Sequence, residues 1–242
     1  MGHREIELKL LADITAMRRL RRLPWLKALQ KGPAVTHTLR SVYFDTPDYR
    51  LSEARVALRI RSIGRRRIQT IKTAGTARGG VFDRGEWESE ISGDTPDSPA
   101  LLAPALADLF TAPVIAELGP VLATEVKRTT VTVDHEGSII EIAFDQGEII
   151  VGEAREPISE VELELLSGPR QALYDLALRL HEAAPMRIGH ANKAERGFRL
   201  LRGEPLQPSK WTGSDVIHGM TAAAAFQSIV GGCIRHLTEN EE

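Results

Sequence analysis

The stretch Glu5-Ile6-Glu7-Leu8-Lys9-Leu10 decides how the rest of the sequence is interpreted, because charged and apolar residues alternate along it. A period of two is typical of a β-strand, which sends successive side chains to opposite faces of a sheet. The three charged residues therefore share one face, and the three apolar residues share the other. This stretch predicts a strand with one charged and one apolar face.

The same alternation of charge recurs in three further segments of the chain. Each segment carries Glu or Arg at every second position, so each expected strand has one face of nearly pure charge. The residues concerned are Arg59 and Arg61; Arg84, Glu86, Glu88 and Glu90; and Glu160, Glu162 and Glu164.

Two arrangements can accommodate such strands. An antiparallel sheet with one solvated face is the simpler interpretation of any single strand. Solvated faces normally mix Thr, Ser, Gln and Lys, however, and rows of carboxylates repel one another. The alternative is a closed barrel with apolar faces outside and charged faces inside, which is tolerable only if the interior is wet and its charges balance. Carboxylates would then hold Mg²⁺ or Mn²⁺, and Arg and Lys would hold a polyphosphate.

Other segments of the sequence complete the expected fold. Helices are expected from Asp13 or Thr15 to Leu29, near 104–110 and over 170–184. Residues 204–220 are expected to form a linker, and 221–242 a last helix. Strands are expected at 5–10, 37–44, 56–63, 67–73, 81–91, 123–134, 139–144, 148–155 and 158–166.

Composition limits the class of protein. The 242 residues include 31 Lys and Arg and 33 Asp and Glu, and the net charge of −2 gives no argument for nucleic-acid or membrane binding. The basic run 18–22 is expected to be the solvated face of a helix. Cys233 is the single cysteine, and neither a signal peptide nor an apolar run of about 18 residues stands out. A cytoplasmic protein without nucleic-acid or membrane partners is expected.

The charged strands and their flanking segments resemble the CYTH superfamily, the triphosphate tunnel metalloenzymes. The resemblance implies an α+β fold over residues 1–203. This fold is a closed antiparallel eight-stranded β-barrel, or tunnel, with a charged interior and helices packed outside. The motifs that carry the resemblance, in the order of the family, are Glu5–Lys9, Val42–Pro47, Ala57–Arg61, Gln69–Lys72, Arg84–Glu88, Arg128, Phe144–Gly147, Ser159–Glu164 and Asn192–Gly197.

The resemblance also implies an activity, which is hydrolysis of inorganic triphosphate to phosphate and pyrophosphate by attack of water, with Mg²⁺ or Mn²⁺ as cofactor. The implied metal ligands are Glu5, Glu7, Glu86, Glu88, Asp145, Glu160, Glu162 and Glu164. The implied phosphate-binding residues are Lys9, Arg59, Arg61, Lys72, Arg84, Arg128 and Lys193. The implied catalytic residues are Lys9, Glu160 and Glu162. For Glu86 and Glu88, a purely structural pairing with Arg59 and Arg61 across strands is the alternative.

Other functions stay open on the same fold. They are hydrolysis of thiamine triphosphate or a nucleoside triphosphate, cyclisation of ATP by a class IV-type adenylate cyclase, and non-catalytic binding of polyphosphate. An organic group needs room and aromatic contacts at a tunnel mouth, for which Trp25 and Trp87 are the candidates. The sequence contains no aromatic-rich rim, so inorganic triphosphate is the preferred substrate.

The segment 221–242 resembles the first helix of a CHAD domain, an all-helical basic domain that often follows a CYTH domain and is associated with polyphosphate. The resemblance implies inorganic triphosphate or polyphosphate as the ligand. It also implies a CHAD domain as a partner in the full-length protein.

Overall fold

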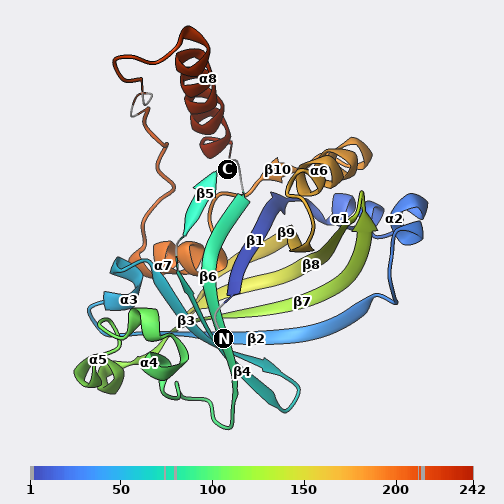
Figure 1. Ribbon diagram of the computed structural model, residues 1–242. Helices are drawn as coiled ribbons and strands as arrows, with labels where there is room; N and C mark the ends of the chain where they lie inside the picture. The colour runs from blue at the N-terminus through green and yellow to red at the C-terminus, as the bar shows by residue number, and fades with distance from the viewer. Residues whose placement is uncertain (1–2, 74, 79–80, 212, 214–215, 242) are drawn as a thin grey trace.

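The structure is a computed structural model that describes residues 3–73, 75–78, 81–211, 213 and 216–241. The remaining positions of the expected tunnel domain, linker and last helix lie outside the described residues. Eight strands of this part of the chain close into an antiparallel barrel in the order β1-β9-β8-β7-β2-β3-β4-β6, and β6 pairs back to β1 (Figure 1). The predicted closed eight-stranded barrel is therefore confirmed.

The barrel strands differ in length, and β7 and β8 are the longest. Two short strands, β5 (Thr76–Arg78) and β10 (Arg187–Ile188), pair with β6 and β1. The barrel strands are β1 (His3–Leu11), β2 (Val35–Asp45), β3 (Val56–Ile63), β4 (Arg66–Thr73), β6 (Val81–Ile91), β7 (Gly119–His135), β8 (Ser138–Val151) and β9 (Ala154–Ser167).

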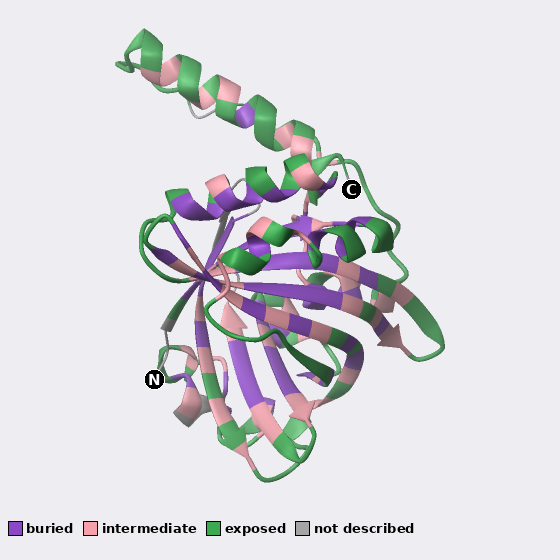
Figure 2. Ribbon diagram, turned by 90° about the vertical axis from the view of Figure 1, so that its right-hand side faces the viewer, coloured by how far each residue is buried: buried purple, intermediate pink, exposed green. Residues whose placement is uncertain are grey.

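Helices cover the apolar outer face of the barrel on two sides. On one side, α1 (Ile14–Leu20), α2 (Pro24–Ala28) and α6 (Gln171–Ala183) pack on the outward side chains of β1, β7, β8 and β9. On the other side, α4 (Pro99–Leu102), the 3₁₀ helix η1 (Pro104–Leu106) and α5 (Ala112–Glu117) border a second apolar cluster with β3, β4 and β6. Burial alternates most clearly along β7, whereas β4, β6 and β9 contain runs of consecutive buried residues because both of their faces are covered (Figure 2).

Two local expectations about the elements were wrong. The single basic helix expected as far as Leu29 is two helices, because Pro24 cannot continue α1 and begins α2 instead. The strands expected at 139–144 and 148–155 are one strand, β8, which runs through Gly147. The chain turns instead at Gly152, where a positive φ of 53° suits glycine.

Helix α7 (Lys193–Arg202) has a different position from the outer helices, because it closes one end of the barrel. Its Ala194 and Phe198 pack against Leu122, Ile149 and Ile158, which belong to the inward-facing set of their strands. Asn192 begins the helix with a capping box, and Gly203 ends it in the left-handed conformation. These caps hold Lys193 at the tunnel end.

Short α3 (Arg50–Glu53) follows β2, and Asp45 fixes the turn between them. The Asp45 carboxylate accepts hydrogen bonds from the backbone amides of Thr46, Leu51 and Ser52. Asp45 is therefore a turn-forming residue, as its position before Thr46-Pro47 suggests.

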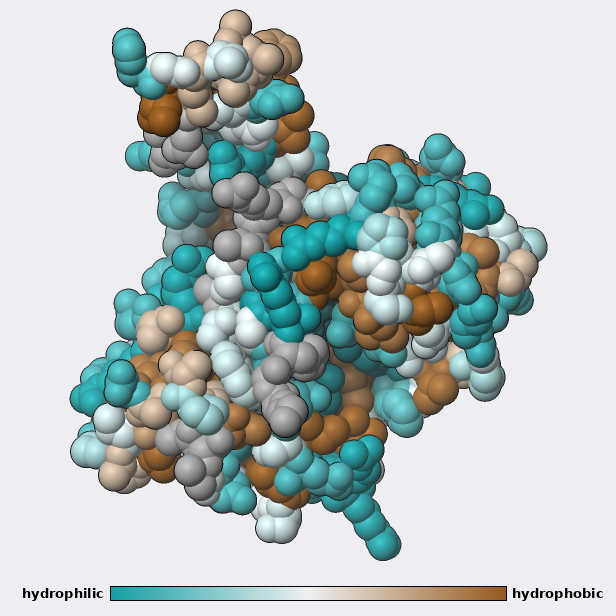
Figure 3. Space-filling model, in the orientation of Figure 1, coloured by the Kyte–Doolittle hydropathy of each residue, from teal (hydrophilic) through white to brown (hydrophobic). Residues whose placement is uncertain are grey.

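The last helix, α8 (Ala222–Glu239), stands away from the barrel at the end of a long connection (Figure 1). Its apolar residues Phe226, Ile229, Ile234 and Leu237 are exposed (Figure 3). The helix touches the connection through His236, whose ring packs edge-on against Trp211. Among the described residues, no helix combines the length and apolar character that crossing a membrane requires.

The barrel wall is especially tight where β7 meets β8 at Gly147. A Cβ atom on Gly147 would lie 1.9 Å from the Glu125 carbonyl oxygen and 2.8 Å from Val126 Cα. Only a residue without a side chain fits so close to a neighbouring backbone. Asp145 and Arg128 meet across the same two strands, so this approach also fixes their separation.

Gly147→Ala is expected to lower the free energy of unfolding by about 1–3 kcal/mol, the usual cost of forcing atoms into filled space. Gly231→Ala is the matched control, because nothing lies within 4 Å of a Cβ at that helical position and alanine favours helix. Urea unfolding followed by circular dichroism measures both variants. Equal midpoints for Gly147→Ala and the unaltered protein would contradict the close approach.

Candidate active site

The charged strand faces enclose a cavity of about 450 Å³ inside the barrel. Strand register creates the lining, since it sets Glu5 opposite Arg84 and Lys9 opposite Glu162. The cavity wall includes thirteen of the residues singled out from the sequence, namely Glu5, Glu7, Lys9, Arg59, Arg61, Lys72, Arg84, Glu86, Glu88, Arg128, Glu162, Glu164 and Lys193. The other two, Asp145 and Glu160, are fully buried and lie directly behind this wall.

Glu162 is the centre of what we call the inner cluster: Lys9, Arg128, Asp145, Glu160, Glu162 and Lys193. Lys9 Nζ and Lys193 Nζ donate to Glu162 Oε1 at 3.2 and 2.8 Å, and Arg128 Nη2 donates to Oε2. Burial alone would raise the pKa of Glu162, but Lys193, Arg128 and Lys9 outweigh burial and hold the pKa well below its usual value. Glu162 is therefore a buried, fully ionised carboxylate.

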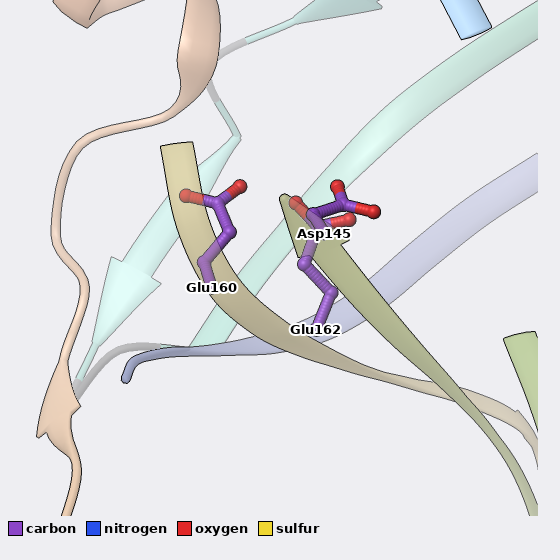
Figure 4. A group of neighbouring side chains, drawn as sticks. All are labelled: Asp145, Glu160 and Glu162. Atoms are coloured by element: carbon purple, nitrogen blue, oxygen red, sulfur yellow. The ribbon is translucent and has the colours of Figure 1, made fainter. Parts of the chain in front are cut away.

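The other two carboxylates of the inner cluster are held in the same way. Arg128 donates two parallel hydrogen bonds of 2.7 and 2.6 Å to Asp145, and Lys193 Nζ lies 2.8 Å from Asp145 Oδ2. Glu160 accepts from Lys9 at 3.2 Å and also from Lys193. Asp145, Glu160 and Glu162 extend from β8 and β9 (Figure 4), with carboxylate oxygens within 4.8 Å of one another. This spacing suits a metal ion, although four cationic side chains, Lys9, Arg128, Lys193 and Arg196, already occupy these oxygens.

A second group of paired charges lies on β1, β4 and β6. Lys72 Nζ and Arg84 Nε each donate to Glu5 at 2.6 Å, and Lys72 also lies 2.9 Å from Glu86. Burial opposes ionisation of Glu5, but the two cations prevail and lower the pKa of Glu5 to about 2. These pairs hold the seam at which β6 closes the barrel on β1.

Arg59 is buried and Arg61 is half-buried in the cavity wall, and the carboxylates that act on Arg59, Glu86 and Glu88, do so without a close ion pair among the described residues. Within the described residues, no carboxylate oxygen lies within 4 Å of either guanidinium, and Arg59 Nε has no hydrogen-bond acceptor. Arg61 reaches only Ser41 Oγ at 3.4 Å. Burial, together with Arg59 and Arg128, lowers the pKa of Arg61 to about 9. Two cations on the cavity wall that have no close carboxylate favour a bound anion.

Carboxylates in excess of their cations lie elsewhere in the same cavity. Glu7 Oε1 is buried without a hydrogen-bond partner, and its other oxygen is 3.8 Å from Arg84 Nη2. Burial and the charge of Glu162 raise the pKa of Glu7. Burial, followed by the charge of Glu5, raises the pKa of Glu164 to about 7. These oxygens favour a bound cation, as Arg59 and Arg61 favour a bound anion.

Glu88 is placed less deeply than the other implied ligands. Its side chain is exposed at the cavity edge, where it accepts a hydrogen bond of 2.7 Å from Thr70 Oγ1. Among the described residues, Glu88 forms no ion pair within 4 Å of Arg59 or Arg61, although its charge helps to raise the pKa of Arg59. The two tryptophans considered for a rim do not line the cavity, since Trp25 stacks under Arg179 and Trp87 packs with the outer apolar cluster.

Tyr43 and Glu141 are two of the cavity-lining residues that sequence reasoning did not assign to the site. Tyr43 lies opposite Arg59 on β2, and its hydroxyl hydrogen-bonds to that guanidinium. Burial raises the pKa of Tyr43, but Arg59, Lys193 and Arg61 outweigh burial and leave it below its usual value. Glu141 also faces the cavity. Its spacing of four from Asp145 on one strand was the available signal, and splitting β8 in two concealed it.

Comparisons with known proteins agree with this geometry. The CYTH domain model matches residues 3–198. An inorganic triphosphatase from Haemophilus influenzae is 37% identical over 165 residues, covering 67% of this chain and 46% of that protein. The chain thus spans about half the length of this curated relative.

Solved structures share the fold. A Hippeastrum protein, named as an adenylyl cyclase with a dominant triphosphatase activity, superimposes with a TM-score of 0.57 at 23% identity, over 84% of this chain and 97% of that chain. The PH1819 protein of Pyrococcus horikoshii gives 0.53 at 20% identity, over 83% and 99%. The match over residues 3–198, together with the charge-lined barrel, establishes that the chain belongs to the CYTH family.

Proposed function

We propose that this protein hydrolyses inorganic triphosphate to phosphate and pyrophosphate, with a divalent cation, inside the barrel. The observation that carries the proposal is the pair Arg59, which is buried, and Arg61, which is half-buried; both face the cavity, and among the described residues neither has a carboxylate oxygen within 4 Å. Planar guanidinium groups suit phosphate oxygens, which they bind in bidentate fashion. The 37% identical triphosphatase from Haemophilus influenzae supports the same activity.

Binding of triphosphate would exchange partners among the charged side chains. The phosphate oxygens first meet Arg59 and Arg61 and then compete with Glu162 for Lys9, Arg128 and Lys193. Each cation that turns to phosphate leaves a carboxylate oxygen without a partner. The remaining phosphate contacts would come from Lys72 and Arg84, which now hold Glu5.

The carboxylates fit a hard divalent cation such as Mg²⁺ or Mn²⁺, because they offer only oxygen donors and because Glu7 Oε1 is already unpartnered. The ion supplies charge neutralisation on phosphate oxygens and a more acidic bound water. The residues proposed to hold one or two ions are Glu5, Glu7, Glu86, Glu88, Asp145, Glu160, Glu162 and Glu164.

The protein's own groups would then govern the reaction of water with the terminal phosphorus. Glu160 and Glu162, once freed from Lys9 and Lys193, would orient the water and accept its proton. The bond between the terminal phosphorus and its bridging oxygen breaks, and pyrophosphate leaves with the electron pair. Lys9, the arginines and Lys193 stabilise the charge that develops on pyrophosphate.

The cavity wall favours inorganic triphosphate over organic triphosphates. Neither Trp25 nor Trp87 reaches it, and its aromatic residues Tyr43 and Phe198 are partly occupied by Arg59 and by the packing of α7. A nucleoside or thiamine group would have few ring contacts there. An organic triphosphatase, an adenylate cyclase and a non-catalytic polyphosphate-binding module remain the competing functions.

Two wider proposals concern the chain around the barrel. The exposed apolar side chains of α8 support its interpretation as the first helix of a CHAD domain, with long-chain polyphosphate as a further ligand. The free, exposed Cys233 suits a reducing compartment such as the cytoplasm.

Phosphate release is expected to be fastest with inorganic triphosphate and to require Mg²⁺ or Mn²⁺. The measurement compares inorganic triphosphate, ATP and thiamine triphosphate at equal concentration, with the metal ion or with a chelator. Faster release from an organic triphosphate would contradict the proposed substrate but would remain consistent with hydrolysis inside the barrel. Tight binding of triphosphate without any release would instead make the protein a binding module.

Arg59→Met and Arg128→Met are expected to separate substrate binding from stability. Arg59→Met should reduce kcat/KM for triphosphate by about 10²-fold while leaving the free energy of unfolding within about 1 kcal/mol, because the lost cation has no carboxylate partner. Arg128→Met should cost about 3–5 kcal/mol of stability, since Asp145 and Glu162 lose a buried partner. Equal destabilisation by the two substitutions would give Arg59 a structural role.

The stability of the chelated protein is expected to fall as the pH rises from about 5 to 8. The pKa of Glu164 rises from 4.5 to about 7 in the folded protein, so the folded state binds the proton more tightly than the unfolded chain does. The stabilisation that Glu164 contributes is therefore fully present below pH 4.5 and is lost as the pH rises through 7. Over the same pH range, the melting temperature of Glu164→Gln should fall less than that of the unaltered protein. Each 1 kcal/mol of difference in stability corresponds to about 2–4 °C. Identical pH profiles for the two proteins would contradict this.

A further inference from the structure

Three carboxylates form a continuous row across neighbouring strands on the inner wall of the barrel. Glu164 of β9 is directly opposite Glu7 of β1 on one side and Glu141 of β8 on the other. Directly opposed side chains of an antiparallel pair have Cβ atoms about 4.5–5.5 Å apart. All three residues line the same cavity. We call them the acidic row.

The acidic row has almost no cationic partners, unlike the inner cluster. Within the described part of the chain, Glu141 and Glu164 take part in no hydrogen bond or ion pair, and the closest cation to Glu7 is Arg84 at 3.8 Å. The inner cluster, in contrast, matches Asp145, Glu160 and Glu162 with Lys9, Arg128 and Lys193. Neighbouring like charges repel, so a cation from solution would stabilise the row.

The environment of Glu7 independently indicates a ligand. Glu7 is only 5% exposed, and its Oε1 atom has no hydrogen-bond partner although it borders the cavity. A buried carboxylate oxygen without a partner is costly, and native structures rarely leave one so. A bound cation would satisfy it.

We propose that the acidic row binds a divalent cation in the free protein, before triphosphate enters, with Glu141 as a ligand. Glu164 lies between its two neighbours, so its carboxylate can share an ion with either of them. Mg²⁺ and Mn²⁺ keep several waters when they bind to proteins, so two or three carboxylates are sufficient in a wet cavity. At the inner cluster, by contrast, an ion must first displace ammonium and guanidinium groups.

The proposal rests on the proposed metal-dependent function. It adds an order of binding, in which the divalent cation binds before triphosphate. An ion on the acidic row adds positive charge to the cavity that already contains the unpaired Arg59 and Arg61. The triphosphate then enters a tunnel with one cation in place. An ion can bind to the carboxylates of the inner cluster only after phosphate has drawn Lys9, Arg128 and Lys193 away from these carboxylates.

Manganese binding without any phosphate compound tests the proposal. The free Mn²⁺ signal in electron paramagnetic resonance, with isothermal titration calorimetry, gives the stoichiometry and Kd for the intact protein. One Mn²⁺ per chain is expected. Glu141→Gln should raise Kd at least about 10-fold, in the range found when supporting groups of metal sites are removed. Glu148→Gln is the matched control, because Glu148 is on the same strand with the opposite parity and pairs with Arg155 at the surface.

Asp145→Asn provides the comparison with the inner cluster, and circular dichroism checks that each variant is folded. A larger rise in Kd for Glu141→Gln than for Asp145→Asn supports the acidic row. The reverse order, an unchanged Kd in Glu141→Gln, or no Mn²⁺ binding by the unaltered protein would overturn it. Triphosphate hydrolysis is measured separately. Turnover without Mn²⁺ binding to the free protein rejects the row alone, and Mn²⁺ binding without turnover on any triphosphate rejects the proposed function alone.

Discussion

The barrel depends on one buried carboxylate, Glu162, that three cations share. Lys9 from β1, Arg128 from β7 and Lys193 from the first turn of α7 all bond to this side chain of β9. A buried ion pair gives little net stability, but removing one member leaves a charge without compensation. Glu162 therefore fixes which strands, and which end helix, can assemble around the cavity. The apolar clusters outside the barrel stabilise the fold, while this carboxylate specifies its interior.

Charge balance also explains where ligands are proposed to bind. Pairs such as Lys72 with Glu5 are satisfied within the protein, so they contribute structure in the absence of ligand. Among the described residues, Arg59 and Arg61 have no carboxylate oxygen within 4 Å, and the acidic row has one cation within 4 Å, Arg84 at 3.8 Å from Glu7, within one cavity of about 450 Å³. A ligand that carries both signs, such as a metal triphosphate, would complement both groups at once. The proposed binding is therefore an exchange of ion pairs rather than insertion of an apolar group.

Much of this architecture could be predicted from the sequence, for a physical reason. Side chains of a strand alternate strictly, so Glu5, Glu7 and Lys9 had to share a face, and an almost purely charged face had to be enclosed with its counterions. The partners of each charge could not be predicted, because they depend on register: Glu162 meets Lys9 only because β1 and β9 are aligned at that residue.

The omissions have equally local causes. Helix α7 carries a capping box, Asn192 with Glu195, that was treated only as part of a family motif. Glu141 was missed because 139–144 and 148–155 were predicted as separate strands, whereas Gly147 lies inside the single strand β8 and allows close strand approach. Whether a glycine lies inside a strand or between two strands cannot be decided from the sequence pattern alone.

A crystal structure with Mn²⁺ and a slowly hydrolysed triphosphate analogue tests the central claim most directly. The account predicts the phosphate chain inside the barrel against Arg59 and Arg61, with Lys9, Arg128 and Lys193 turned from Glu162 towards phosphate oxygens. An analogue bound outside the barrel, or bound inside with all three cations still on Glu162, would contradict the exchange of ion pairs.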